Sequence, residues 1–307
     1  MVLLFRDRSR RTGRGDEQFR VVCDRVRNHS TSGEDVSRLE GKVAFITGIG
    51  RGQGRSHAVR LASEGADIIG VDICHDIDST AYPMSTKDDL DETVRQVEAL
   101  GRRIVARVAD VRDSAALRQA VQEGVEQLGR LDFAVPNAGI STAHFKITTP
   151  EQDEQAWNDV IAVNLTGAWN SVQAAIPYIV AGGRGGSIVF IGSTAGLRGV
   201  GAGGYTAAKH GIVGIMRGLA NELAEDNIRV NAVHPTAVNT LMATNEGMQA
   251  YLADQVANGS HHLNALPVEL LEPADVSAAI AFLCSDEGRY ITGTNLPVDA
   301  GFVNRVD

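Results

Sequence analysis

Cysteine is scarce in this chain of 307 residues. Its three cysteines, Cys23, Cys74 and Cys284, are an odd number, lie far apart and form no C-x-x-C pair. A disulfide framework needs paired cysteines, and a zinc site needs closely spaced Cys or His ligands. We therefore expect reduced thiols and no metal site.

Long apolar runs are lacking as well. No stretch approaches the roughly 20 apolar residues that a membrane-spanning helix needs, and the apolar start over residues 1–5 meets Arg6 too early for a secretory signal. A composition of 43% hydrophobic and 22% charged residues is typical of a globular protein with a sizeable core. The sequence predicts a cytoplasmic protein that does not engage a membrane.

Positive charge is in short supply over most of the chain. Residues 1–38 hold nine of the 29 basic and six of the 38 acidic residues, which leaves 20 basic against 32 acidic groups in residues 39–307. Such an acidic body binds nucleic acid poorly. Residues 1–38 show little apolar periodicity and predict a disordered extension. A basic docking arm, or a translation start placed too far upstream, is the alternative interpretation.

From Leu39 onwards, short apolar runs alternate with helical stretches of ten or more residues, which is typical of βαβ units. The expected strands are Val43–Thr47, Asp67–Val71, Arg103–Ala109, Leu131–Pro136, Ser187–Ile191, Ile228–Val233 and Asn295–Val298. The expected helices are Gly52–Glu64, 88–100, Ser114–Leu128, 151–180, 204–225 and 273–285. Residues 39–307 thus predict a single-domain α/β fold: a Rossmann-type doubly wound parallel sheet of about seven strands, with helices on both faces.

Two connections are longer than this alternation requires. Residues 73–87 intervene between the second strand and its helix, and residues 239–272 follow the sixth strand. Long connections in a compact domain are more often functional than idle. We refer to residues 73–87 as the insert and expect residues 239–272 to form a substrate lid.

A glycine-rich turn follows the first strand directly. Gly48, Gly52 and Gly54 allow a tight turn and a close approach of the backbone to a pyrophosphate at the N-terminus of the next helix. Asp72 ends the second strand about twenty residues later, where a carboxylate accepts hydrogen bonds from an adenosine ribose. No Gly-Lys-Ser/Thr follows the turn, so it is not a P-loop. The pattern predicts a dinucleotide site.

The charges around this turn bear on which dinucleotide binds. The carboxylate of Asp72 repels the 2′-phosphate of NADP and favours NAD, whereas the guanidinium of Arg51 is able to pair with that phosphate. A fixed like charge outweighs a flexible surface arginine. We therefore predict NAD as the cofactor.

A candidate proton-transfer group lies in the predicted helix over 204–225. Tyr205 and Lys209 are four residues apart and share one helix face, and Ser193 follows the preceding strand at the end where open α/β sheets bind ligands. An ammonium beside a phenol is expected to lower the phenol pKa from its usual value near ~10. Tyr205 is therefore the predicted acid/base.

At this point the chain resembles the short-chain dehydrogenase/reductase family. The motifs that carry the resemblance are Thr47-Gly48-x-x-x-Gly52-x-Gly54, Asp110-Val111, Asn137-Ala138-Gly139, Asn164, Ser193, Tyr205-x-x-x-Lys209 and Val298-Asp299-Ala300-Gly301. The resemblance implies a catalytic tetrad in which Tyr205 is the acid/base, Ser193 binds the substrate oxygen, Lys209 holds the ribose and Asn164 fixes a water in a proton relay.

The same resemblance implies the residues that contact the cofactor. They are Gly48, Arg51, Gly52, Gln53, Gly54, Asp72, Ile73, Asp110, Val111, Asn137, Ala138, Gly139, Tyr205, Lys209, Pro235, Thr236, Val238 and Thr240. Pro136 and Thr236 stand where many members have Asn and Gly. The second departure alters the backbone next to the nicotinamide, which affects the contacts expected from 236–240.

A narrower resemblance, carried by residues 50–57, 71–74, 82–84 and 234–236, is to the carveol-dehydrogenase-like branch associated with the redox peptide mycofactocin. It implies that the insert covers NAD, which then exchanges poorly and is reoxidised in place by a mycofactocin-type acceptor. A surface loop with no role in exchange is the alternative. Family resemblance also implies a homotetramer, with residues 204–225 and 295–301 at interfaces.

These features together predict an NAD-dependent oxidoreductase that interconverts a hydrophobic secondary alcohol, carveol-like or terpenoid, and its ketone. An NADPH-dependent 3-oxoacyl-thioester reductase is the alternative within enzymes, and the acidic Asp72 speaks against it. A non-catalytic dinucleotide-sensing module is the alternative outside enzymes. The intact Tyr205 and Lys209 speak against that function.

Overall fold

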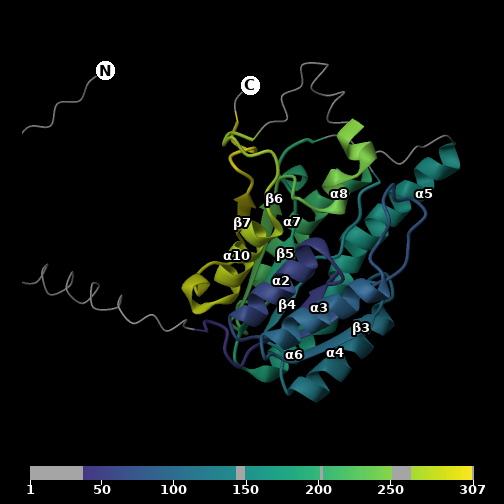
Figure 1. Ribbon diagram of the computed structural model, residues 1–307. Helices are drawn as coiled ribbons and strands as arrows, with labels where there is room; N and C mark the ends of the chain where they lie inside the picture. Colours follow the sequence, from purple (N-terminus) through teal and green to yellow (C-terminus); the bar gives the residue numbers. More distant parts are fainter. Residues whose placement is uncertain (1–36, 143–148, 201–202, 251–263, 306–307) are drawn as a thin grey trace, which may run out of the picture. The chain divides into compact units, whose positions relative to one another are not determined.

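The computed structural model describes residues 37–142, 149–200, 203–250 and 264–305, and its centre is one parallel sheet of seven strands (Figure 1). The strands are β1 (Val43–Thr47), β2 (Asp67–Asp72), β3 (Ile104–Val108), β4 (Phe133–Val135), β5 (Gly186–Ile191), β6 (Ile228–Pro235) and β7 (Asn295–Val298). Their order across the sheet is β3-β2-β1-β4-β5-β6-β7. The predicted α/β fold and its parallel seven-stranded sheet are confirmed.

The strand order reverses between β1 and β4. The chain moves outward from β1 through β2 to β3, and β4 then returns to the free side of β1, where Ala44 pairs with Phe133 and Ile46 with Val135. At such a switch point the loops after the two strands leave in opposite directions and open a crevice. The glycine-rich turn after β1 and the Asn137 segment after β4 both begin at this crevice.

Helices cover both faces of the sheet because alternate strand residues point to opposite sides. Val43 and Phe45 of β1 pack into one core, and Ala44 and Ile46 pack into the other. The first core is closed by α4 (Ser114–Leu128), α5 (Pro150–Ile161), α6 (Ala168–Gly182) and α7 (Gly204–Glu222). The second is closed by α2 (Gly52–Ser63), α3 (Lys87–Ala99) and α10 (Pro273–Cys284). A short α8 (Leu241–Thr244) follows β6.

The stretch predicted as one long or broken helix over 151–180 is helical from Pro150 to Gly182, with a π-helical segment at Ala162–Gly167 between α5 and α6. Asn164 lies within that segment. A π turn adds a residue to the helical repeat and often occurs at functional sites, because it redirects one side chain without ending the helix.

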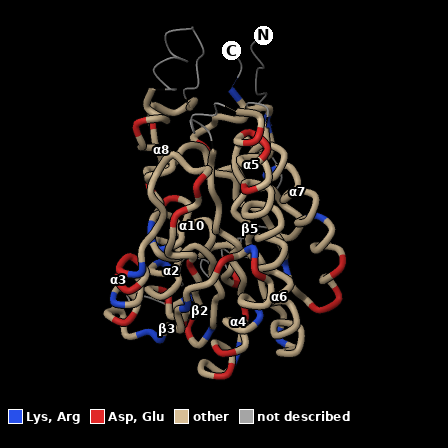
Figure 2. The backbone as a smooth tube through the Cα atoms, turned by 90° about the vertical axis from the view of Figure 1, so that its right-hand side faces the viewer, with Lys and Arg blue, Asp and Glu red and all other residues tan. Residues whose placement is uncertain are grey.

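The outward face of α3 is charged and solvated. Lys87 pairs with Asp91 and Arg95 with Glu92, one helical turn apart, and both signs follow one another along this helix (Figure 2). None of the helices in the described ranges is both long and apolar enough to cross a bilayer.

The compact unit of the fold runs from Ser37 to Asp307. Most of the predicted extension over 1–38 lies outside the described residues, so its disorder stays a prediction. Arg38 is described, and its guanidinium contacts Glu64 and Glu287, each at 2.6 Å.

Candidate dinucleotide and catalytic site

The turn after β1 is shaped by backbone contacts that only glycine permits. Gly48 and Gly52 have φ values of +73° and +55°, which is the left-handed region where a side chain is strained. A Cβ on Gly54 would lie 1.9 Å from the carbonyl oxygen of Gly48. Helix α2 therefore starts directly against the end of β1, as the glycine spacing predicts.

The N-terminus of α2 is suited to an anion. Its N-cap residue, Arg51, makes no side-chain capping bond, so the first-turn N–H groups of the helix keep their donor capacity and the positive end of the helix dipole faces outward. In addition, Oε1 of Gln53 is buried without a hydrogen-bond partner in the described part of the chain. A buried acceptor of this kind indicates a ligand that supplies a donor.

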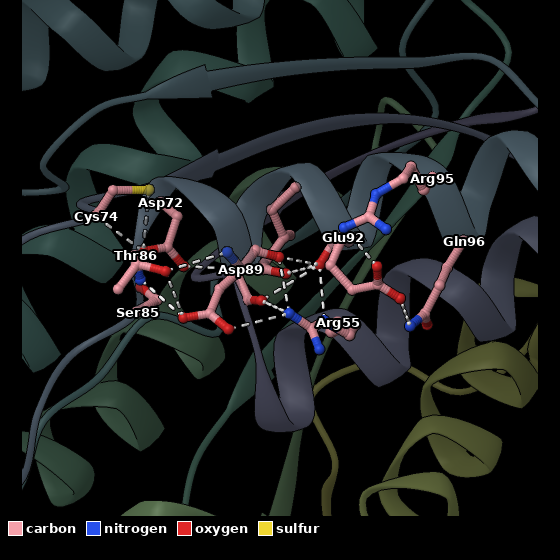
Figure 3. Close-up of polar contacts among 12 residues, drawn as sticks. Arg55, Asp72, Cys74, Ser85, Thr86, Asp89, Glu92, Arg95 and Gln96 are labelled. Atoms are coloured by element: carbon pink, nitrogen blue, oxygen red, sulfur yellow. Dashed lines mark hydrogen bonds and ion pairs between the residues drawn. The ribbon is translucent and has the colours of Figure 1, made fainter.

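Asp72 lies beside this turn, at the carboxyl end of β2, with its side chain surrounded by donors (Figure 3). The backbone N–H groups of Gly50, at 2.7 Å, and Cys74, at 3.1 Å, donate to its carboxylate. The hydroxyl of Ser85, from the end of the insert, also donates to it. Asp72 is only 5% exposed. Its carboxylate is thus held at one edge of the crevice in a fixed orientation.

The end of the insert is fastened to the glycine-rich turn through α3. Thr86 and Asp89 form a capping box at the start of α3. Arg55 of α2 donates to the carbonyl oxygen of Asp89 at 2.7 Å and to that of Gly50 (Figure 3). One guanidinium therefore ties the turn after β1 to the helix that follows the insert.

The segment after β4 forms the other wall of the crevice. The amide of Asn137 donates to the carbonyl oxygen of Thr47 at 2.8 Å, and the hydroxyl of Thr47 accepts from the backbone N–H of Ala138 at 3.0 Å. Asn164 pairs with the backbone of Ile140 through both ends of its amide, each at 2.8 Å. The π turn therefore directs Asn164 onto the segment that follows β4.

The crevice contains a cavity of about 400 Å³. This volume is within the usual range of small-molecule sites. Most of the predicted cofactor contacts line it: Gly48, Arg51, Gly52, Gln53, Gly54, Asp72, Ile73, Asp110, Val111, Asn137, Ala138, Gly139 and Thr240. Leu241 and Met242, which begin α8, also line it.

Five predicted contacts are not among the described residues that line this cavity: Tyr205, Lys209, Pro235, Thr236 and Val238. Within the described residues, Val238 is buried and bridges to Leu271. The hydroxyl of Thr236 donates to Asn264 at 3.1 Å, and Pro235 ends β6. Part of the predicted substrate lid, residues 251–263, lies outside the described residues.

The insert contributes more to the cavity than its range alone predicted. Its residues in the lining are Ile73, Ile77, Tyr82, Met84 and Ser85. Ser79 donates to Asp159 of α5 at 2.8 Å, and the guanidinium of Arg51 donates to the carbonyl oxygen of Pro83. Sequence reasoning did not assign Ile77 or Tyr82 to the site, although residues 82–84 carried part of the narrower resemblance. The available signal was the presence of large apolar side chains, Ile73, Ile77, Tyr82 and Met84, in a connection that otherwise consists mostly of small and polar residues.

Three of the four predicted catalytic side chains, those of Ser193, Tyr205 and Lys209, meet next to the end of β5. Ser193 follows that strand, and Tyr205 and Lys209 are one turn apart on α7. The Lys209 Nζ lies 5.6 Å from the centre of the Tyr205 ring and donates to the carbonyl oxygen of Ile191 at 2.8 Å. The spacing of four residues therefore places the ammonium against the phenol.

The pKa values of this pair differ from the sequence expectation. Burial raises the pKa of Tyr205, and a hydrogen bond with Ser193 opposes that change. Burial also lowers the pKa of Lys209 to about 8. The expected lowering of the tyrosine pKa by lysine is wrong for the described residues, because burial disfavours charge on both groups. Burial thus favours the neutral phenol of Tyr205 over its phenolate.

A buried histidine behind the turn was missed by the sequence reasoning. Nδ1 of His57 lies 2.8 Å from the hydroxyl of Ser277, and that hydroxyl donates to the carbonyl oxygen of Pro273 at 2.9 Å. The hydroxyl of Ser56 lies 2.8 Å from the same Ser277 hydroxyl. Burial lowers the pKa of His57 to about 3, so this histidine is neutral in the folded protein and packs α2 against α10.

Comparison with known proteins relates this arrangement to characterised folds. The family model described as enoyl-(acyl carrier protein) reductase matches residues 48–303. An oxidoreductase of Mycobacterium tuberculosis is 55% identical over 273 residues, which cover 87% of this chain and 98% of that protein. The (−)-trans-carveol dehydrogenase of Rhodococcus erythropolis is 48% identical over 275 residues, which cover 87% of this chain and 99% of that protein.

A solved structure extends the likeness to three dimensions. Carveol dehydrogenase from Mycobacterium avium, in complex with NAD, superposes with a TM-score of 0.81 at 50% identity, over 87% of this chain and 99% of that one. The matches span the glycine-rich turn, both walls of the crevice and the Ser193-Tyr205-Lys209 cluster. The chain therefore belongs to the short-chain dehydrogenase/reductase family, as its motifs predicted.

Proposed function

We propose that this protein is an NAD-dependent oxidoreductase that interconverts a hydrophobic secondary alcohol, of carveol-like or terpenoid type, and its ketone. The observation that carries the proposal is one cavity lined by Asp72, by the uncapped start of α2 and by the start of α8, in a fold that also sets Lys209 against Tyr205. The glycine turn and the orphaned Gln53 acceptor fit a dinucleotide. Relatives that are named for carveol and for NAD support the same assignment.

The choice of NAD over NADP rests on Asp72. Its buried carboxylate repels a 2′-phosphate at the place where the adenosine ribose is expected. Arg51, the residue that favours NADP in the sequence, donates instead to the carbonyl oxygen of Pro83 in the insert. The charge of Asp72 and the engagement of Arg51 with Pro83 both disfavour NADP binding. They therefore speak against the alternative function, an NADPH-dependent thioester reductase.

The mechanism follows from the positions of the chain's own side chains. Bound NAD supplies the hydride acceptor for oxidation, and NADH the donor for reduction. Tyr205 holds a proton on its hydroxyl, which it donates to the ketone oxygen during reduction; in oxidation its phenolate removes the alcohol proton. Ser193 binds the same substrate oxygen. Lys209, fixed on Ile191, orients the phenol and adds positive charge behind it.

The finer parts of the proposal concern the fate of the cofactor. Because the insert lines the cavity and is fastened to Asp72, Arg51 and Asp159, we propose that it acts as a lid that slows NAD exchange. A mycofactocin-type carrier then reoxidises the cofactor in place. A homotetramer with residues 204–225 and 295–301 at interfaces, and a cytoplasmic location, complete the proposal.

The test is turnover and NAD binding by Tyr205→Phe, with Tyr178→Phe on α6 as the matched control. Loss of the phenolic proton should reduce turnover of a hydrophobic secondary alcohol by at least about 100-fold, while NAD still binds. The control variant should keep full turnover. Persistent turnover by Tyr205→Phe would contradict the assigned acid/base, and a wild-type protein that binds no NAD would contradict the function as a whole.

A further inference from the structure

A buried tyrosine of the insert, Tyr82, lines the cavity. It lies in the insert, is only 7% exposed, and belongs to the same lining as Asp72 and the segment after β4. Its neighbour Pro83 is held by Arg51. Nothing in the mechanism above uses the phenol of Tyr82, although burying a hydroxyl is unfavourable unless both its donor and its acceptor capacity are used.

The oxygen of Tyr82 has a defined partner. The backbone N–H of Ser141 donates to it at 3.1 Å. The carbonyl oxygen of the same peptide group, that of Ile140, accepts from Asn164 at 2.8 Å. In a trans peptide these two groups point in opposite directions. Tyr82 and Asn164 therefore form hydrogen bonds to opposite edges of one peptide group. These bonds fix the phenol oxygen of Tyr82 next to Asn164.

The hydroxyl of Tyr82 also carries a hydrogen that it is able to donate. A phenol offers one O–H donor besides its acceptor lone pairs, and the bond from Ser141 uses only a lone pair. Among the residues that the structure describes, no group accepts a hydrogen bond from Tyr82. A buried donor without an acceptor is costly, and here the residue lines a cavity. Such a donor indicates a ligand oxygen.

We propose that the hydroxyl of Tyr82 donates a hydrogen bond to a ribose or phosphate oxygen in the nicotinamide half of the bound dinucleotide. The inference rests on the proposed NAD function. The position next to the Ile140–Ser141 peptide selects that half, because Asn164 of the catalytic tetrad holds the same peptide. Asp72 and Ser85 act at the adenosine end. The insert then holds both ends of the cofactor.

The acidity of Tyr82 suits this role. Burial raises its pKa to about 12, and a charge on the nearby Tyr205 acts in the same direction. Tyr82 therefore stays a donor at every pH where the protein works, and it does not compete with Tyr205 for proton transfer. Its removal is expected to weaken cofactor retention without removing the acid/base.

The experiment measures the release of NADH from wild-type protein, Tyr82→Phe and the control Tyr178→Phe, by fluorescence during a chase with excess NAD. Tyr82→Phe keeps the ring and removes only the hydroxyl, and release should accelerate about tenfold, the factor expected for one hydrogen bond. The KM for alcohol should be unchanged. Protein with 3-fluorotyrosine at position 82, which is a stronger donor of the same shape, should release NADH more slowly than wild type.

The outcomes separate this inference from the function it rests on. If wild-type protein binds no NADH, the proposed function fails and the role of Tyr82 fails with it. If wild-type protein binds NADH but both position-82 variants release it at the wild-type rate, only the role of Tyr82 is overturned. Should Tyr82→Phe fail to fold, the fluorotyrosine protein decides alone, since its shape is retained.

Discussion

Replacing Lys209 with methionine separates the electrostatic cost of this residue from its packing. Lys209 is 4% exposed, and burial lowers its pKa to about 8 from an unfolded value near 10.5. Each pKa unit corresponds to about 1.4 kcal/mol, so the buried ammonium destabilises the folded protein by about 3 kcal/mol at pH 7. Methionine removes that cost. It also removes the hydrogen bond to the carbonyl oxygen of Ile191, which the ammonium makes more strongly than the neutral amine.

The sign of the pH dependence follows from proton binding. Between pH 8 and pH 10.5 the unfolded chain binds more protons at this position than the folded protein, so wild-type stability rises with pH. Urea unfolding of both proteins at pH 7, 8, 9 and 10, at one protein concentration, measures the difference in unfolding free energy. Relative to Lys209→Met, the wild type should gain about 2 to 3 kcal/mol between pH 7 and pH 10.

The control for this series is Lys87→Met on the solvated face of α3, where the side chain is 59% exposed. Its difference from wild type should stay constant over the same pH range. A constant difference for Lys209→Met as well would refute the argument, because it would mean that the ammonium is not desolvated. The methionine variant should also lose turnover, whatever its stability.

Two further perturbations test the charges around the cavity. Asp72→Ser should weaken NAD binding roughly 10- to 100-fold, which is the effect of losing hydrogen bonds to a charged group, and should make NADP binding detectable. Titration of the protein with each nucleotide measures both effects. The control, Asp78→Ser at an exposed position of the insert, should leave the affinity for both nucleotides unchanged. His57→Gln should remove a pH dependence of the unfolding free energy. The pKa of His57 is about 3 in the folded protein and 6.5 in the unfolded chain, so the unfolding free energy of wild-type protein should fall by about 2 kcal/mol relative to the variant between pH 7 and pH 5. Equal slopes for wild type, His57→Gln and the exposed control His75→Gln would show that His57 titrates normally.

Much of the fold was accessible from the sequence because it depends on local patterns. Apolar runs and intervening helices predicted the parallel sheet, and the glycine spacing after Thr47 predicted the tight turn into α2. The spacing of Tyr205 and Lys209 predicted their contact, since residues four apart share a helix face. These features follow from backbone geometry over a few residues, so no knowledge of distant contacts was needed.

Other features depended on the tertiary structure. The π turn that directs Asn164 onto Ile140 requires the packing of α5 and α6 against the sheet. The raised pKa of Tyr205 is a consequence of burial, which periodicity does not measure. Tyr82 reaches Ser141, 59 residues away, only because the insert folds back over the switch point.

The sequence by itself determined the sheet, the glycine turn and the pairing of Tyr205 with Lys209, because each is encoded in residues that are neighbours along the chain or along one helix. Only the tertiary structure decided which insert residues line the cavity and in which direction burial shifts the pKa values of the buried groups. Those properties depend on desolvation and on hydrogen bonds between segments that are far apart in the chain, such as Ser85 with Asp72 and Ser79 with Asp159.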